Sequence, residues 1–112
     1  MIEQRKYERI RTAGSVRLMA DTSEGLRVVS GHLVDLSEGG CAILTQTRIE
    51  VPAAGRIQVE VGGTQIWLPI VMRSVCWLGR AWRIGCAFDR PTDDKQRAVR
   101  ALVWERQKLV RS

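Results

Sequence analysis

Hydrophobic and polar residues alternate along much of the chain as far as residue 88, which is the pattern of strands that bury one face. Other stretches are continuous runs rich in β-branched residues, and glycines or short polar groups separate the segments. The pattern predicts strands at residues 15–20, 26–36, 41–45, 56–61, 65–77 and 81–88. Most of the chain is therefore predicted to be β-structure.

Three of the links between these strands are short and contain glycine. Residues 21–25 (DTSEG), 61–65 (VGGTQ) and 77–82 (WLGRAW) each supply a residue that tolerates positive φ, as hairpin turns require. Successive antiparallel hairpins leave exposed edges unless the sheet closes on itself. We therefore expect an all-β fold built as a small, six-stranded antiparallel barrel.

The periodicity changes after residue 89. Residues 91–94 (PTDD) form a helix-start cluster, and apolar residues such as Ala98, Val99, Leu102 and Val103 then recur near helical spacing. This predicts a C-terminal helix whose apolar stripe packs on the barrel or covers one of its open ends. The exposed side of this helix is strongly basic, so binding of nucleic acid through it is an alternative.

Length and composition indicate one ordered domain. The chain has 112 residues, of which 45% are hydrophobic and 27% charged, and its net charge of +6 favours an anionic partner without selecting one. It contains no apolar run long enough to cross a bilayer, and the N-terminus is too charged for a secretory signal. We expect a cytoplasmic protein.

Cysteines and tryptophans are interpreted as structural residues. Cys41, Cys76 and Cys86 are odd in number and form no C-x-x-C pair, so buried thiols are expected rather than a disulfide framework or a zinc site. Trp67 and Trp77 share parity on one predicted strand, which places them on one face. The tryptophans are expected in the core; a stacking platform for single-stranded nucleic acid is the alternative.

A polar interruption divides the apolar run VDLSEGGCAIL at residues 34–44. Gly39 and Gly40 permit a tight turn and a close approach of another molecule to the backbone. Asp35 and Ser37 are two residues apart, which on a strand directs both side chains to one face. A carboxylate there can accept two hydrogen bonds from an N–H/NH₂ edge such as that of guanine. Local capping of the turn is the alternative, and the two roles are compatible.

Two arginines near the N-terminus form a second candidate cluster. Arg5 and Arg9 are four residues apart and precede the first predicted strand. A guanidinium group can bind guanine O6 and N7 bidentately, pair with phosphate or stack on a base. The alternative is a solvated, flexible terminus.

The order of these motifs resembles that of the PilZ domain family. R-x-x-x-R precedes the first strand, D-x-S-x-x-G-G ends the second, and RIGCAF at residues 83–88 forms a late strand. The resemblance covers almost the whole chain and implies a six-stranded PilZ-type barrel with a C-terminal helix. It also implies one domain over residues 1–112, in which residues 1–13 form a flexible arginine-bearing arm, 14–89 the barrel and 92–111 the helix.

Members of this family are bacterial receptors for the second messenger cyclic di-GMP, so the resemblance implies a ligand site. Arg5 and Arg9 match the arginines that contact phosphates and guanine edges. Asp35, Ser37 and Gly40 match the motif that holds a guanine edge, with the glycine leaving room for the ligand.

One departure from the family pattern concerns stoichiometry. Many members have a third arginine immediately before the R-x-x-x-R pair, where this chain has Gln4. Gln4, Lys6 and Gly39 are further candidate contacts, and whether one or two ligand molecules bind stays open.

The resulting functional hypothesis is a non-enzymatic receptor with no cofactor and no metal. No paired acids, phosphate-binding loop or nucleophile with a histidine partner is recognisable in the sequence. The receptor would bind cyclic di-GMP and signal through an unidentified target protein. Two alternatives stay open: a PilZ-fold adaptor that does not bind the nucleotide, and a basic small-barrel protein that binds nucleic acid.

Overall fold

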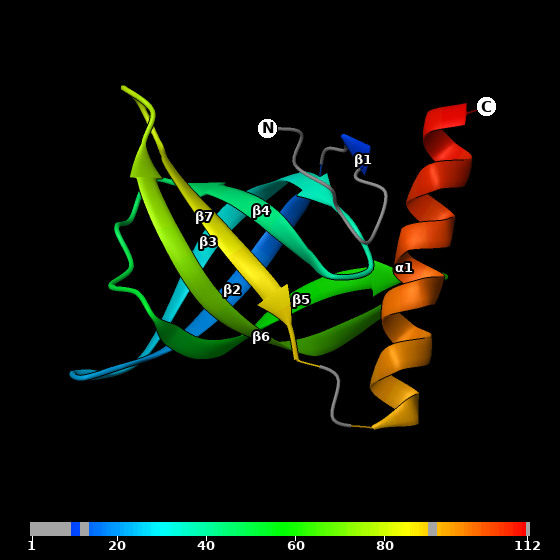
Figure 1. The fold of residues 1–112 in the computed structure, drawn as a ribbon, viewed down its shortest axis with the longest axis horizontal. Coiled ribbons are helices and arrows are strands. Elements are labelled where there is room, and N and C mark those ends of the chain that lie inside the picture. Colours follow the sequence, from blue (N-terminus) through cyan, green and yellow to red (C-terminus); the bar gives the residue numbers. More distant parts are fainter. Residues whose placement is uncertain (1–9, 12–13, 90–91, 112) are drawn as a thin grey trace, which may run out of the picture.

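A computed structural model describes residues 10–11, 14–89 and 92–111, which form strands and one long helix (Figure 1). The elements are β1 (Ile10–Arg11), β2 (Ser15–Thr22), β3 (Gly25–Leu36), β4 (Gly40–Thr45), β5 (Ala53–Val61), β6 (Thr64–Trp77), β7 (Trp82–Phe88) and α1 (Asp93–Arg111). The six predicted strands and the helix are all confirmed, with small differences at their ends.

Strands β2 to β7 close into an antiparallel barrel. The hydrogen-bonded order is β3-β2-β5-β6-β7-β4, and a further pairing between β3 and β4 joins the two ends of this sheet. Short hairpins connect neighbouring strands: Gly62 and Gly63 adopt φ values of 58° and 81° between β5 and β6, and Gly79 adopts 94° between β6 and β7. The predicted barrel is confirmed.

A seventh, very short strand lies beside β3. Ile10 pairs with Leu36 and Arg11 with Asp35, so β1 continues the edge of β3 beyond the point where β2 begins at Ser15. The sequence analysis places these two residues in the flexible arm, and two residues are too few for periodicity to reveal a strand. This pairing matters for function because it brings the chain that follows Arg9 beside Asp35.

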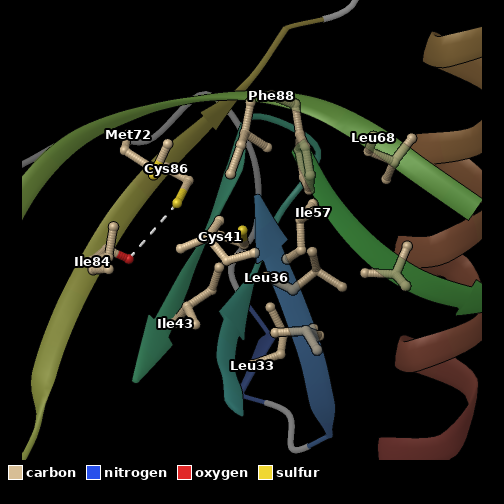
Figure 2. Close-up of a cluster of buried hydrophobic side chains, with 14 of the residues drawn as sticks. Leu33, Leu36, Cys41, Ile43, Ile57, Leu68, Met72, Ile84, Cys86 and Phe88 are labelled. Atoms are coloured by element: carbon tan, nitrogen blue, oxygen red, sulfur yellow. Dashed lines mark hydrogen bonds between the residues drawn. The ribbon is translucent and has the colours of Figure 1, made fainter. Parts of the chain in front are cut away.

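The barrel core is filled by inward-facing aliphatic side chains from every long strand. Leu33 and Ile43 are fully buried where β3 and β4 meet, and Ile57, Leu68 and Ile84 come from the other strands (Figure 2). Helix α1 stands across one end of the barrel (Figure 1). Val99, Leu102 and Val103 of α1 are buried and belong to the same apolar cluster. The predicted packing of the helix on the barrel is therefore confirmed.

Polar contacts fix the position of α1. The amide nitrogen of Gly62, in the β5–β6 turn, donates to Glu105 Oε2 at 2.8 Å, and Lys95 Nζ donates to the carbonyl oxygen of Trp67 at 3.3 Å. Asp93 and Asp94 lie in the first helical turn, where negative charge complements the helix dipole. The helix is thus held by its apolar stripe and by two hydrogen bonds to the barrel.

The tryptophans differ from the sequence-based expectation. A register shift between Met72 and Ser74 reverses the alternation of β6: Leu68 is buried before it and Val75 packs toward the core after it. Trp67 and Trp77 consequently lie on opposite faces, not on one. Neither is part of the buried core, since Trp77 is 50% exposed and Trp67 is half-buried.

Two cysteines are buried as predicted, and one is not. Cys41 on β4 is directly opposite Cys86 on β7, and both point into the core, whereas Cys76 is exposed. A hydrogen bond with Cys86 and burial raise the pKa of the Cys41 thiol well above its ordinary value. The thiol therefore stays protonated at neutral pH, as expected for a structural cysteine.

Candidate functional site

Ser37 stabilises the turn between β3 and β4. Its amide nitrogen donates to the carbonyl oxygen of Gly40 at 2.8 Å. Its hydroxyl oxygen accepts from the amide nitrogens of Gly39 at 3.2 Å and Gly40 at 3.3 Å. Because β3 ends at Leu36, Ser37 lies in the turn instead of continuing the strand face of Asp35. The turn-capping interpretation is therefore confirmed for Ser37.

Replacing Ser37 by alanine is expected to lower the free energy of unfolding by about 1–2 kcal/mol, since two amide donors in a part-buried turn lose their acceptor. Denaturant unfolding measures this change. The matched control is Ser23→Ala in the exposed β2–β3 turn, for which a change within about 0.5 kcal/mol is expected. Equal effects of the two substitutions would contradict the capping role.

Gly40 is required by the barrel itself. A Cβ atom at this position would collide with the carbonyl oxygen of Cys86 on the neighbouring strand β7. On the other side of the turn, the amide nitrogen of Phe88 donates to the carbonyl oxygen of Gly39 at 3.0 Å. Gly40 thus lets the strand lie against β7, which is a reason for this glycine that sequence reasoning did not provide.

Asp35, near the end of β3, directs its carboxylate to the outside of the barrel. It lies between the fully buried Leu33 and Leu36, after a register shift in β3, and pairs across the sheet with Ala42. Its carboxylate oxygen Oδ2 is 3.5 Å from Arg83 Nη2, and its side chain is 20% exposed. The carboxylate is therefore oriented by a guanidinium group and still reaches the surface.

Arg83 is a site residue that sequence reasoning missed. It lies on β7, whose inward positions include Ile84, so the Arg83 side chain is directed to the outside. Strand β4 separates β7 from β3 in the sheet, and Arg83 pairs with Leu44 of β4. The pairing of β4 with both β3 and β7 brings this arginine to Asp35. In the sequence, its alternation with apolar neighbours on the predicted strand could have indicated only that it faces outward.

A second ion pair links the turn to α1. Arg100 Nε of the helix is 3.5 Å from Glu38 Oε1. Glu38 lies in the turn itself, between Ser37 and Gly39. Both side chains are more than one-third exposed, so the pair contributes little to stability by itself. It does tie the turn to the helix, so each of the two guanidinium groups near the turn, Arg83 and Arg100, has an acidic partner.

The N-terminal candidates Gln4, Lys6, Arg5 and Arg9 lie outside the described residues. The described chain begins at Ile10, which pairs with Leu36. The end of the R-x-x-x-R motif in the sequence is thus followed directly by a residue at the candidate site.

This combination of a closed six-stranded barrel, one helix across its end and a D-x-S-x-x-G turn on its surface is that of a PilZ domain. A family model described as "PilZ domain" matches residues 3–104. The chain therefore belongs to the PilZ domain family.

Solved structures share this fold at low sequence identity. The PilZ domain of YcgR from Escherichia coli, solved with c-di-GMP, has a TM-score of 0.76 and 16% identity, and the match covers 97% of this chain and 95% of that one. The PilZ domain of CeSA from a cellulose-synthesizing bacterium has a TM-score of 0.73 and 22% identity, covering 88% and 96%. MrkH of K. pneumonia in complex with c-di-GMP has a TM-score of 0.72 and 19% identity, covering 93% of this chain but 52% of MrkH.

Two further findings complete the comparison. No curated protein matches the sequence closely enough to serve as a relative. Within the described part of the chain, no helix combines the length and the apolar character needed to cross a bilayer.

Proposed function

We propose that this PilZ domain is a receptor for cyclic di-GMP. The observation that carries the proposal is the position of Asp35: a partly exposed carboxylate, 3.5 Å from Arg83, beside the Ser37–Gly40 turn. A carboxylate in this setting can accept hydrogen bonds from the ring N–H and the amino group of guanine at the same time. The complete motif and the family membership support this assignment.

The proposed ligand contacts divide between the barrel and the N-terminal arm. Asp35 binds the Watson–Crick edge of one guanine, and the Ser37 turn holds the backbone at Gly39 and Gly40 in a fixed position. Arg5 and Arg9 supply guanidinium groups for the phosphates and for guanine O6 and N7. Gln4 and Lys6 are further contacts of the arm.

Signalling follows from binding without any chemical step. The arm orders over the ligand, and the changed surface is recognised by a target protein in the bacterial cytoplasm. We propose this ordering of the arm as the mechanism by which ligand binding is signalled to the target protein.

Nucleic-acid binding through α1 has less support. Arg97 Nη2 lies 2.7 Å from Asp94 Oδ1, Arg100 pairs with Glu38, and Lys95 donates to a barrel carbonyl group. These basic side chains have local partners, so their charges are partly neutralised within the domain. The contacts of these side chains within the domain therefore give the basic residues of the helix a structural role that does not involve nucleic acid.

Isothermal titration calorimetry with cyclic di-GMP tests the proposal, with GTP and cyclic di-AMP as controls. Saturable binding of cyclic di-GMP alone is the expected result, and the molar ratio distinguishes one ligand from two. Absence of heat, together with an unchanged thermal midpoint in excess ligand, would refute the receptor function and favour a nucleotide-free adaptor.

A further inference from the structure

A polar groove lies on the outside of the barrel, and its lining residue Leu44 pairs across the sheet with Arg83. It has a volume of about 680 Å³ and crosses the outer faces of β5, β2, β3 and β4 as far as the β6–β7 turn. Cross-strand pairing forms its floor, because Arg17 is opposite both Gln58 and Ser30. None of the site residues Asp35, Ser37, Gly40 and Arg83 lines this groove. It is therefore a concave surface of ligand-binding size whose residues differ from those of the Asp35 site.

The groove combines positive charge with many hydrogen-bonding groups. Arg17 and Arg80 contribute guanidinium groups, and the described residues that line it include no aspartate or glutamate. Amide and hydroxyl groups come from Gln46, Gln58, Gln65, Ser15, Ser30 and Thr45. Amides donate and accept, so they can bind the main chain of an extended peptide, whereas the arginines favour carboxylates.

The groove ends beside an exposed aromatic hairpin. Trp77 is 50% exposed and Leu78 is 52% exposed, and only Gly79 separates them in the chain from the groove residues Arg80 and Ala81. The Trp77 and Trp82 rings pack with centroids 5.1 Å apart. Large exposed apolar groups beside arginines are typical of the anchor residues of protein interfaces.

Hydrogen bonds hold this hairpin in a defined shape. The amide nitrogen of Leu78 donates to the carbonyl oxygen of Ala81 at 2.9 Å, and Gln46 Nε2 donates to the carbonyl oxygen of Arg80 at 3.1 Å. The guanidinium group of Arg48 lies 5.7 Å from the centre of the Trp82 ring. A preorganised hairpin loses little conformational entropy when a partner binds it.

From this charge and shape we infer that the groove and the 77–82 hairpin bind an acidic, extended segment of a partner protein. Carboxylates of the segment pair with Arg17 and Arg80, and an apolar side chain packs on Trp77 and Leu78. Two arginines are few for nucleic acid, whose binding rests on many phosphate contacts and gains nothing from Leu78. This surface shares no residue with the proposed nucleotide site, and its use as an output face of the receptor rests on the proposed function.

A fluorescein-labelled peptide of alternating acidic and apolar residues (glutamate with leucine and phenylalanine) tests this inference by fluorescence anisotropy. We expect wild-type protein to bind it and Arg17→Glu/Arg80→Glu to bind at least about tenfold more weakly, because attraction becomes repulsion. Arg27→Glu, an exposed charge reversal on β3 that does not line the groove, is the control and should bind like wild type. Thermal unfolding verifies that all variants are folded.

Several results would overturn the inference. One is that the wild-type protein does not bind the peptide up to about 1 mM, and another is that Arg27→Glu weakens peptide binding as much as the double substitution does. A third is that a labelled single-stranded oligonucleotide binds the wild-type protein more tightly than the peptide does and no longer binds the double variant. A wild-type dimer that becomes monomeric in the double variant would assign the face to self-association instead. Cyclic di-GMP titration of the double variant should match wild type, so failure of the receptor function is detected separately.

Discussion

Alanine at Asp35 is expected to weaken cyclic di-GMP binding by about tenfold to a hundredfold. A bidentate contact with a guanine edge contributes about 1–3 kcal/mol, and the Asp35 carboxylate is the proposed acceptor of that contact. The fold should persist, because the Arg83–Asp35 pair is partly exposed, and such pairs contribute only about 0–1 kcal/mol. Calorimetric titration measures the change in affinity, and thermal unfolding measures stability.

Two further variants make the Asp35 experiment specific. Asp35→Asn keeps the shape of the side chain and one acceptor oxygen but replaces the other acceptor with an amide donor, so it should weaken binding by less than alanine does. Asp21→Ala removes an exposed carboxylate at the far end of β2 and should bind normally. Wild-type affinity in both Asp35 variants would show that the guanine edge is bound elsewhere.

Alanine at Gly40 is expected to lower the free energy of unfolding by about 3 kcal/mol or more. The added methyl group would collide with the carbonyl oxygen of Cys86, and main-chain atoms of two paired strands cannot move apart without loss of their hydrogen bonds. For a domain of this size the thermal midpoint should fall by about 10 °C or more. Differential scanning calorimetry measures it.

A second glycine provides the matched control for Gly40. Gly62 has a φ of 58° but open space around its added Cβ atom, so Gly62→Ala should cost only about 1–2 kcal/mol through backbone strain. A Gly40→Ala protein that is as stable as wild type but binds cyclic di-GMP more weakly would contradict this prediction. It would show that the glycine leaves room for the ligand and is not needed for packing against Cys86. The predicted instability also means that lost binding in this variant is not by itself a measure of a ligand contact.

Local patterns were sufficient to predict the elements of this fold. Strands with one buried face alternate in polarity, glycines mark the hairpins, and the apolar spacing after residue 92 is helical. The errors fall where an extra residue interrupts the alternation. The register shift after Met72 moved Trp77 to the face opposite Trp67, and no single-residue pattern in the sequence signals that shift.

The candidate site was only partly predictable for a related reason. Asp35, Ser37 and Gly40 are close in sequence, so a motif can identify them, although the hydroxyl of Ser37 proved to cap the turn. Arg83 reaches Asp35 from a strand far along the chain. Such a contact depends on strand order, which local patterns do not contain.

The sequence by itself therefore determined the strands, the hairpins, the helix and the motif, because each depends on residues that are neighbours in the chain. The tertiary structure alone decided the contacts across the closed barrel. These include the Arg83–Asp35 pair, the clearance of Gly40 against Cys86 and the groove of Arg17 and Arg80. They exist because closing the sheet joins β3 to β4 and brings distant strands around one core.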